Sequence, residues 1–140
     1  MRLFLFLCLS LSFLLPTPVL GKDHQSKSIE GNWKVVSVQR EGQPEEDYED
    51  RGMRVVYTDD GRVISWIEKR KYQERLYELK GQDQLLVITD TNNNGKVDPD
   101  ERKQAEVMRW SRQEDVLTVN TGVGNKGKPA AIMRMERIGD

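Results

Sequence analysis

From Ile29 onward, apolar and polar residues alternate in short runs that are separated by turn signals. In the run 116–119, Leu117 and Val119 share one face of an extended chain, and Thr118 lies on the other face. Eight such runs predict strands over residues 33–39, 53–58, 62–68, 72–79, 84–89, 106–111, 115–120 and 130–138. No long stretch has the period of a helix, so the pattern predicts an all-β domain.

The connections between these runs predict how the strands are joined. Asp59-Asp60-Gly61 is a strong hairpin signal, and we expect two further hairpins around residues 80–83 and 112–114. The acidic stretch 42–52, which contains Pro44, and the glycine-rich stretch 121–128 are expected to be loops. Eight strands in sequential hairpins predict a closed, antiparallel up-and-down barrel. A two-sheet β-sandwich is the alternative, because strand count does not separate the two architectures.

The first 21 residues have the pattern of a secretory signal peptide. Arg2 precedes an almost wholly apolar stretch from Leu3 to Leu15, and Pro16 and Pro18 follow this stretch before Gly21. We therefore expect residues 1–21 to be removed, residues 22–28 to form a flexible lead-in, and residues 29–140 to form one β domain in a secreted or periplasmic protein. No membrane attachment is expected after cleavage.

The stretch from Asp90 to Glu101 has the spacing of a calcium loop. Loops of this kind supply oxygen ligands from positions 1, 3, 5, 7, 9 and 12, and a glycine at position 6 permits a sharp turn. Gly95 occupies the sixth position, and the ligand positions hold Asp90, Asn92, Asn94, Lys96, Asp98 and Glu101. Lys96 would offer only its backbone carbonyl. These twelve residues resemble the loop of the EF-hand family, and the resemblance predicts a Ca²⁺ site.

The flanks of this loop predict a strand–loop–short-helix arrangement. Residues 84–89 read as a buried strand, and Pro99 can begin a short helix over residues 99–105 with Asp98 as its N-cap. Only three of the ligand positions carry carboxylates, so we expect weak binding, with a Kd of about 10⁻⁴–10⁻³ M. The alternative is a polar connection between two strands that binds no metal.

Gly31-Asn32-Trp33 on the first strand, the meander of eight strands and an arginine on the last strand resemble the lipocalin-like (calycin) pattern. The resemblance covers the whole domain in outline. It implies that Trp33 closes one end of a barrel and that Arg134 or Arg137 packs across it, a contact favoured by cation–π attraction. The interior of an eight-stranded barrel is just wide enough to hold one small apolar ligand or to be filled by side chains.

The charged, cysteine and histidine residues of the chain argue against two classes of function, nucleic-acid binding and catalysis. Without residues 1–21 the chain has 21 lysines and arginines against 23 acidic residues, which argues against a nucleic-acid partner. The only cysteine would be lost, and the only histidine, His24, lies in the lead-in, so we expect no enzyme and no catalytic residue. We expect a monomer.

Six aromatic side chains could line an apolar pocket or could simply fill the core, and three methionines could form an adaptable surface or fill gaps in the core. They are Trp33, Trp66, Trp110, Tyr57, Tyr72, Tyr77, Met108, Met133 and Met135. The sequence thus predicts an exported lipocalin-like binding protein with one structural calcium site and a small apolar ligand. The alternative is a secreted protein-interaction or inhibitor scaffold with a filled barrel and no metal.

Overall fold

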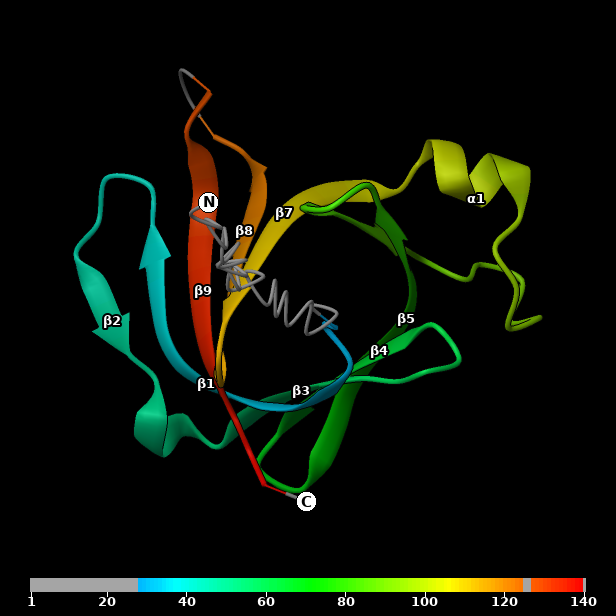
Figure 1. The fold of residues 1–140 in the computed structure, drawn as a ribbon. Coiled ribbons are helices and arrows are strands. Elements are labelled where there is room, and N and C mark those ends of the chain that lie inside the picture. The colour runs from blue at the N-terminus through cyan, green and yellow to red at the C-terminus, as the bar shows by residue number, and fades with distance from the viewer. Residues whose placement is uncertain (1–27, 125–126, 140) are drawn as a thin grey trace, which may run out of the picture.

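The computed structural model describes residues 28–124 and 127–139 (Figure 1). In these residues the chain forms strands with one 3₁₀ helix and one short α-helix: β1 (Gly31–Arg40), β2 (Glu45–Asp47), η1 (Glu49–Arg51), β3 (Met53–Tyr57), β4 (Arg62–Ile67), β5 (Arg70–Lys80), β6 (Gln84–Ile88), α1 (Pro99–Lys103), β7 (Glu106–Gln113), β8 (Val116–Val123) and β9 (Pro129–Arg137). The domain is therefore all-β, as the alternation predicts.

The sheet closes on itself. Strands β1 and β3 to β9 pair antiparallel in chain order, and β9 pairs back with β1 from Trp33↔Arg137 to Arg40↔Ala131. This closure confirms the eight-stranded up-and-down barrel and excludes the β-sandwich. It also explains why one sheet can be stable here, because closure pairs the first and last strands of the barrel with each other.

Stretch 42–52 differs from the prediction of a plain loop. Strand β3 pairs with β1 only from Gly31 to Lys34, which leaves the later part of the same β1 edge open. The short strand β2 pairs with that part, from Ser37 to Gln39, and η1 follows it. Tertiary pairing thus imposes a strand on an acidic segment whose composition indicates a loop.

Three smaller boundaries also differ. β5 begins at Arg70 rather than at residue 72, so the turn before it consists of Glu68 and Lys69. β7 continues to Gln113, and its turn with β8 consists of Glu114 and Asp115 rather than residues 112–114. α1 ends at Lys103, within the expected range 99–105.

The barrel interior is filled at one end. Buried side chains from alternate positions of the strands form one core, and Trp33, Val35, Leu85, Leu117 and Met135 are fully buried in it. Ile29 precedes β1 and is also fully buried, and its carbonyl accepts a hydrogen bond from Trp33 Nε1 at 2.9 Å. The residues just before β1 therefore cap this closed end.

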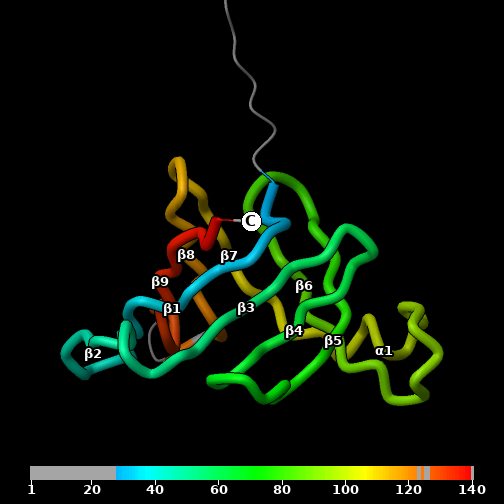
Figure 2. Tube along the Cα trace, turned by 90° about the horizontal axis from the view of Figure 1, so that it is seen from below, coloured from blue at the N-terminus to red at the C-terminus, as the bar shows by residue number. Residues whose placement is uncertain are grey.

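The two ends of the barrel carry different connections. Tight turns join β3 to β4, β5 to β6 and β7 to β8 at the closed end, where the described chain also begins and ends. The segment with β2 and the segment with α1 lie toward the opposite end (Figure 2). The long connections therefore surround the end that Trp33 does not fill.

The predicted signal peptide 1–21 and most of the lead-in 22–28 lie outside the described residues. In the part of the chain that is described, no helix has the length and apolar character needed to cross a membrane.

Candidate functional site

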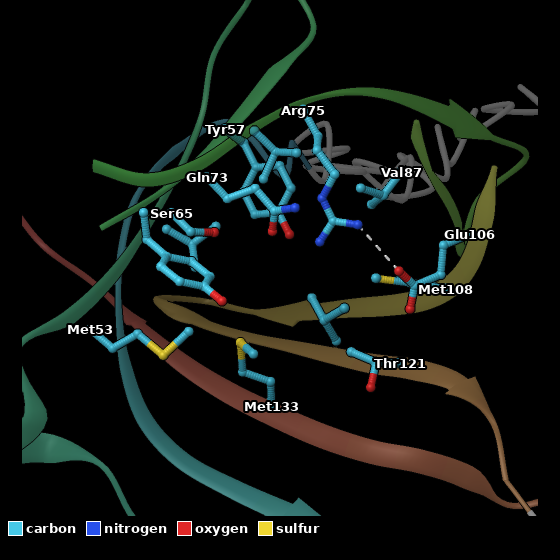
Figure 3. A pocket seen from close by; sticks show the side chains of 14 residues that line it. Met53, Tyr57, Ser65, Gln73, Arg75, Val87, Glu106, Met108, Thr121 and Met133 are labelled. Atoms are coloured by element: carbon cyan, nitrogen blue, oxygen red, sulfur yellow. Dashed lines mark hydrogen bonds and ion pairs between the residues drawn. The ribbon is translucent and has the colours of Figure 1, made fainter. Parts of the chain in front are cut away.

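The end of the barrel opposite Trp33 contains a cavity of about 280 Å³ (Figure 3). Its floor is made of buried side chains, which come from β3, β4, β6, β7 and β8: Val55, Tyr57, Val63, Val87, Met108 and Val119. Its rim is made of partly or largely exposed side chains: Met53, Ser65, Tyr72, Gln73, Arg75, Glu106, Thr121 and Met133. The cavity is thus apolar at its base and mixed at its mouth.

The inward alternation of the strands explains this arrangement. On β8, Leu117 lies in the filled core, Val119 on the cavity floor and Thr121 on the rim. On β7, which runs the other way, Trp110 lies in the core, Met108 on the cavity floor and Glu106 on the rim. Because inward residues recur at every second position, these two strands run from core to rim and become more polar on the way.

The rim carries one ion pair. Arg75 Nη1 on β5 lies 3.4 Å from Glu106 Oε2 at the start of β7 (Figure 3). The Arg75 side chain is 27% exposed and that of Glu106 is 42% exposed. Sequence reasoning did not select either residue. Only the strand register could have placed them, because their charge alone indicates a solvated surface.

The predicted pocket aromatics divide between three places. Tyr57 and Tyr72 line the cavity, whereas Trp33, Trp110 and Tyr77 belong to the core. Trp66 lies outside that core, with the Arg54 guanidinium 5.1 Å from its ring centroid. Of the three methionines, Met108 and Met133 line the cavity, and Met135 is fully buried in the core.

Tyr57 and Tyr77 form an edge-to-face pair with ring centroids 5.2 Å apart. The Tyr77 hydroxyl donates a hydrogen bond to the Thr58 carbonyl at 2.8 Å. Burial raises the pKa of Tyr77 to about 12, and it also raises the pKa of Tyr57. Both phenols are therefore protonated at neutral pH, so the cavity floor is uncharged.

At the closed end, Trp33 has two arginine neighbours. The guanidinium carbons of Arg112 and Arg137 lie 5.5 Å and 5.8 Å from its ring centroid. The resemblance gives this position to Arg134 or Arg137, and Arg137 occupies it. Arg134 is exposed, as Arg137 is, but lies in register with Thr118. Gly31 has φ +137°, and a Cβ there would meet Arg137 Nη2 at 3.4 Å, so the glycine also makes room for this contact.

The 90–101 loop joins β6 to β7 and is folded around its own side chains. The two carboxylate oxygens of Asp90 accept hydrogen bonds from the backbone N–H groups of Asn94 (3.1 Å) and Gly95 (2.8 Å). Gly95 has φ +71°, the left-handed conformation expected at the sixth position. The side-chain amides of Asn92 and Asn94 both donate to Asp98 Oδ2, at 2.6 Å and 3.1 Å. The side chains at the first, third, fifth and ninth positions therefore turn inward.

Glu101, at the twelfth position, is oriented differently. Its side chain is directed to Thr91, whose backbone N–H and hydroxyl both donate to Oε1 at 2.7 Å. Its other oxygen accepts a hydrogen bond from the Asp98 N–H at 3.4 Å, as part of a capping box at the start of α1. The Lys96 backbone N–H donates a hydrogen bond to Asn94 Oδ1 at 2.7 Å. Hydrogen bonds between the loop's own side chains and backbone therefore hold its conformation.

The donor chemistry of this loop suits a hard cation in part. Oxygen-bearing side chains converge at four of the expected positions, but the Glu101 carboxylate binds Thr91 instead. Among residues 28–124 and 127–139, no group of three or more histidine, cysteine, aspartate or glutamate side chains is placed to hold a metal ion. A calcium ion would therefore depend on the asparagine side chains and the Lys96 carbonyl, and on reorientation of Glu101.

The loop also covers the outer wall of the barrel. Leu76 and Ile88 are paired neighbours on β5 and β6, both are buried, and neither belongs to the interior core. Leu76 lines a groove against Asp90 and Asn94, and α1 packs on β6. Arg102 of α1 holds Glu78 of β5 through two hydrogen bonds of 3.0 Å and 2.7 Å. These contacts fix the loop beside the barrel.

No known protein-family model matches this chain, and no curated protein matches it in sequence. Its class therefore follows from its architecture, which is a closed, eight-stranded, antiparallel up-and-down barrel consistent with a lipocalin-like fold.

Proposed function

We propose that this protein is a lipocalin-like binding protein that takes up a small, largely apolar molecule in the open end of its barrel. The observation that carries the proposal is the cavity of about 280 Å³, whose floor is buried and apolar in a barrel that is otherwise filled. Barrels of eight strands are just wide enough to hold one small ligand. At about 30 Å³ per water-sized group, the cavity accommodates a ligand of roughly ten non-hydrogen atoms.

The proposal includes export of the protein. The apolar stretch in residues 1–21 supports secretion or delivery to the periplasm, where a small binding barrel would meet its ligand outside the cytoplasm. Removal of these residues in the cell, detected by mass spectrometry of the purified protein, tests this part independently. An intact N-terminus would reject export by a cleaved signal peptide.

The methionines provide a direct test of ligand binding. Met53, Met108 and Met133 line the cavity, whereas Met135 is fully buried in the core and serves as an internal control. We expect 1-octanol, titrated into protein made from the full chain, to shift the methyl NMR signals of the three cavity methionines with saturation. The Met135 signal is expected to move little.

Two matched substitutions locate the binding site. Val119→Phe adds bulk on the cavity floor, where Val119 is 2% exposed, and is expected to abolish the shifts. Val107→Phe makes the same change at a position that is 52% exposed and outside the cavity, and is expected to leave them unchanged. If the native protein gives no saturable shift up to the solubility of octanol, the proposal is wrong and a filled protein-interaction scaffold is favoured.

We further propose that the 90–101 loop binds one calcium ion with a structural role. Its support is the inward orientation of Asp90, Asn92, Asn94 and Asp98 around the left-handed Gly95. These residues, the Lys96 carbonyl and a reoriented Glu101 would hold the ion, which would supply positive charge to a loop of oxygen ligands. Binding would stabilise the folded state as the ion concentration exceeds its Kd.

Calorimetric titration of calcium into EDTA-treated protein tests this second proposal, with magnesium as the competing ion. We expect one site and a Kd of about 10⁻⁴–10⁻³ M. Asp90→Asn removes a ligand charge and is expected to abolish binding. Asp100→Asn makes the same change at a non-ligand position that pairs with Lys103, and is expected to have little effect. Equal affinity in both variants would show that the ligand assignment is wrong.

A further inference from the structure

We propose that the cavity selects molecules that carry a carboxylate, and that Arg75 binds this carboxylate in place of Glu106. This inference rests on the proposed ligand-binding function and specifies the class of ligand: a short apolar tail with one anionic head group. The tail would contact the buried floor, and the head group would lie at the rim.

The position of Arg75 is set by the sheet. Leu76, the next residue of β5, pairs with Ile88, the last residue of β6, so β6 ends before it can cover Arg75. The Arg75 side chain lines the cavity and extends past this strand end to Glu106 on β7 (Figure 3). Its guanidinium therefore faces a gap in the barrel wall at the cavity mouth.

The cavity lining holds one cation and one anion, and the cation has more hydrogen-bond donors than its one contact with the anion uses. Among the described residues that line it, Arg75 and Glu106 are the only charged ones. A guanidinium stays protonated at all physiological pH values and offers five N–H donors in a planar fork. The hydrogen bond to Glu106 uses one of them. A ligand carboxylate could bind this fork through two parallel bonds, which is the stronger arrangement.

A ligand carboxylate can replace Glu106 as the partner of Arg75, because the contact between the two residues is long and exposed. Its 3.4 Å distance is long for a charge-assisted bond, and the two-bond pair between Arg102 and Glu78 on the outside of the same barrel is shorter, at 2.7 Å and 3.0 Å. The Glu106 side chain is 42% exposed at the first position of β7, so it can be hydrated when it leaves Arg75. Displacement therefore leaves no buried, unpaired charge.

Three ligands with the same eight-carbon chain test the inference: octanoate, 1-octanol and octylamine. Octanoate has about ten non-hydrogen atoms, which suits the cavity volume. Affinities are measured from the methyl NMR signals of the cavity methionines at pH 7.5 in the presence of EDTA. We expect octanoate to bind about tenfold more tightly than octanol, because it gains charge-assisted bonds to Arg75. Octylamine is expected to bind no more tightly than octanol.

Substitutions identify the recognising group. Arg75→Gln is expected to lower octanoate affinity more than octanol affinity, so that the preference for octanoate is lost, and Arg75→Lys is expected to retain part of the preference. Glu106→Gln removes the competing carboxylate and is expected to tighten octanoate binding about threefold. Arg54→Gln makes the same charge change beside Trp66, outside the cavity, and serves as the control.

The outcomes separate the two proposals. If octanol binds and octanoate binds no more tightly, the carboxylate inference fails and the ligand-binding function stands. If Arg75→Gln keeps the octanoate preference, another group recognises the anion and the inference also fails. If none of the three ligands binds, the proposed function itself fails. Should Arg75→Gln not fold, Glu106→Gln decides, because unchanged octanoate affinity in that variant overturns the displacement step.

Discussion

Glu101 and Thr91 are joined by two hydrogen bonds, in which the Thr91 backbone N–H and hydroxyl both donate to Glu101 Oε1 at 2.7 Å. The Glu101 residue is only 8% exposed. The pair connects the first turn of the 90–101 loop to α1. Because these bonds stabilise the ionised carboxylate, led by the one from the Thr91 hydroxyl, they hold the pKa of Glu101 below its ordinary value.

This lowered pKa predicts a stability change at acid pH. Since the pKa of Glu101 is lower in the folded than in the unfolded protein, its contribution is fully present above the unfolded value of about 4.3. It is lost as the pH falls through the folded value. Thr91→Val removes the hydroxyl donor and is expected to reduce the fall in Tm between pH 6 and pH 3.

The same thermal melts, recorded without calcium, include Thr118→Val as a control. Thr118 lies on β8, in register with Arg134 and away from the loop, so its pH profile is expected to follow that of the native protein. Asp60 and Glu74 also have lowered pKa values, through hydrogen bonds with Thr58 and Lys71 respectively. The stability that these two carboxylates lose at acid pH is the same in every variant. An unchanged profile in Thr91→Val would contradict the role of the hydroxyl.

Trp33 is expected to dominate the stability of the closed end. It is fully buried, and Trp33→Ala should lower the free energy of unfolding by about 3–5 kcal/mol. Arg137→Gln removes a partly exposed cation–π contact and should cost about 0.5–1 kcal/mol. Arg134→Gln is the matched control on the same strand, and its effect is expected to stay within about 0.5 kcal/mol.

Urea unfolding of these three variants provides the measurement. It also decides between the two last-strand arginines that the sequence leaves open. A larger loss in Arg134→Gln than in Arg137→Gln would reverse the assignment and would mean that the contact with Trp33 contributes nothing measurable.

The sequence predicts the barrel well because its strands are marked by local signals. Alternation and turn residues act within a few positions, so they mark all eight barrel strands from Trp33 onward. β2 was missed because its sequence, Glu45 to Asp47, has no strand preference. It forms only because β3 leaves part of the β1 edge unpaired, which is a tertiary effect.

The cavity was harder to predict than the fold. The pairing of β4 with β5 shifts between Ser65 and Trp66, and a one-residue shift exchanges the inner and outer faces of a strand. This shift lies beyond Arg75, which is two positions from the core residue Tyr77 and shares its inward face, but the charge of Arg75 indicates a solvated surface. The loop spacing did identify the inward side chains from Asp90 to Asp98, but it could not show that Glu101 binds Thr91.

The turn between β7 and β8 predicts a stabilising substitution. Glu114 has φ +52°, which costs a residue with a Cβ about 1–2 kcal/mol. Its side chain is exposed, and Arg112 Nε bonds only its backbone carbonyl, at 2.8 Å. Glu114→Gly relieves the strain and keeps this bond, so we expect a gain of about 0.5 kcal/mol after the added flexibility of the unfolded chain is counted.

Thermal or urea unfolding measures this gain. Gln113→Gly is the control, because Gln113 is the last residue of β7 and has no positive φ, so the same change should destabilise the protein by about 0.5–1 kcal/mol. Destabilisation by both substitutions would mean that the turn conformation at Glu114 carries no strain.

Arg62 is predicted to weaken calcium binding by the neighbouring loop. Its guanidinium lines a groove with Asn94 and Gly95, and its Nη2 lies 3.6 Å from where a Cβ on Gly95 would be. A divalent ion and a unit charge about 10 Å apart in water repel each other by roughly 0.8 kcal/mol. Arg62→Gln is therefore expected to tighten calcium binding about threefold in a calorimetric titration.

Arg109→Gln tests whether this effect depends on position. Arg62 is paired with Asp60 and Glu74, and Arg109 is paired with Asp83 at 3.0 Å. Asp83 lies in the turn after β5, at the opposite end of the barrel. Removal of the Arg109 charge should leave calcium affinity nearly unchanged. Because mobile ions screen exposed charges, the difference between the two variants should shrink when the salt concentration is raised toward 1 M. Equal affinities at low salt would mean that Arg62 exerts no field on the loop, and that the weakness of the site comes from its asparagine ligands and the orientation of Glu101.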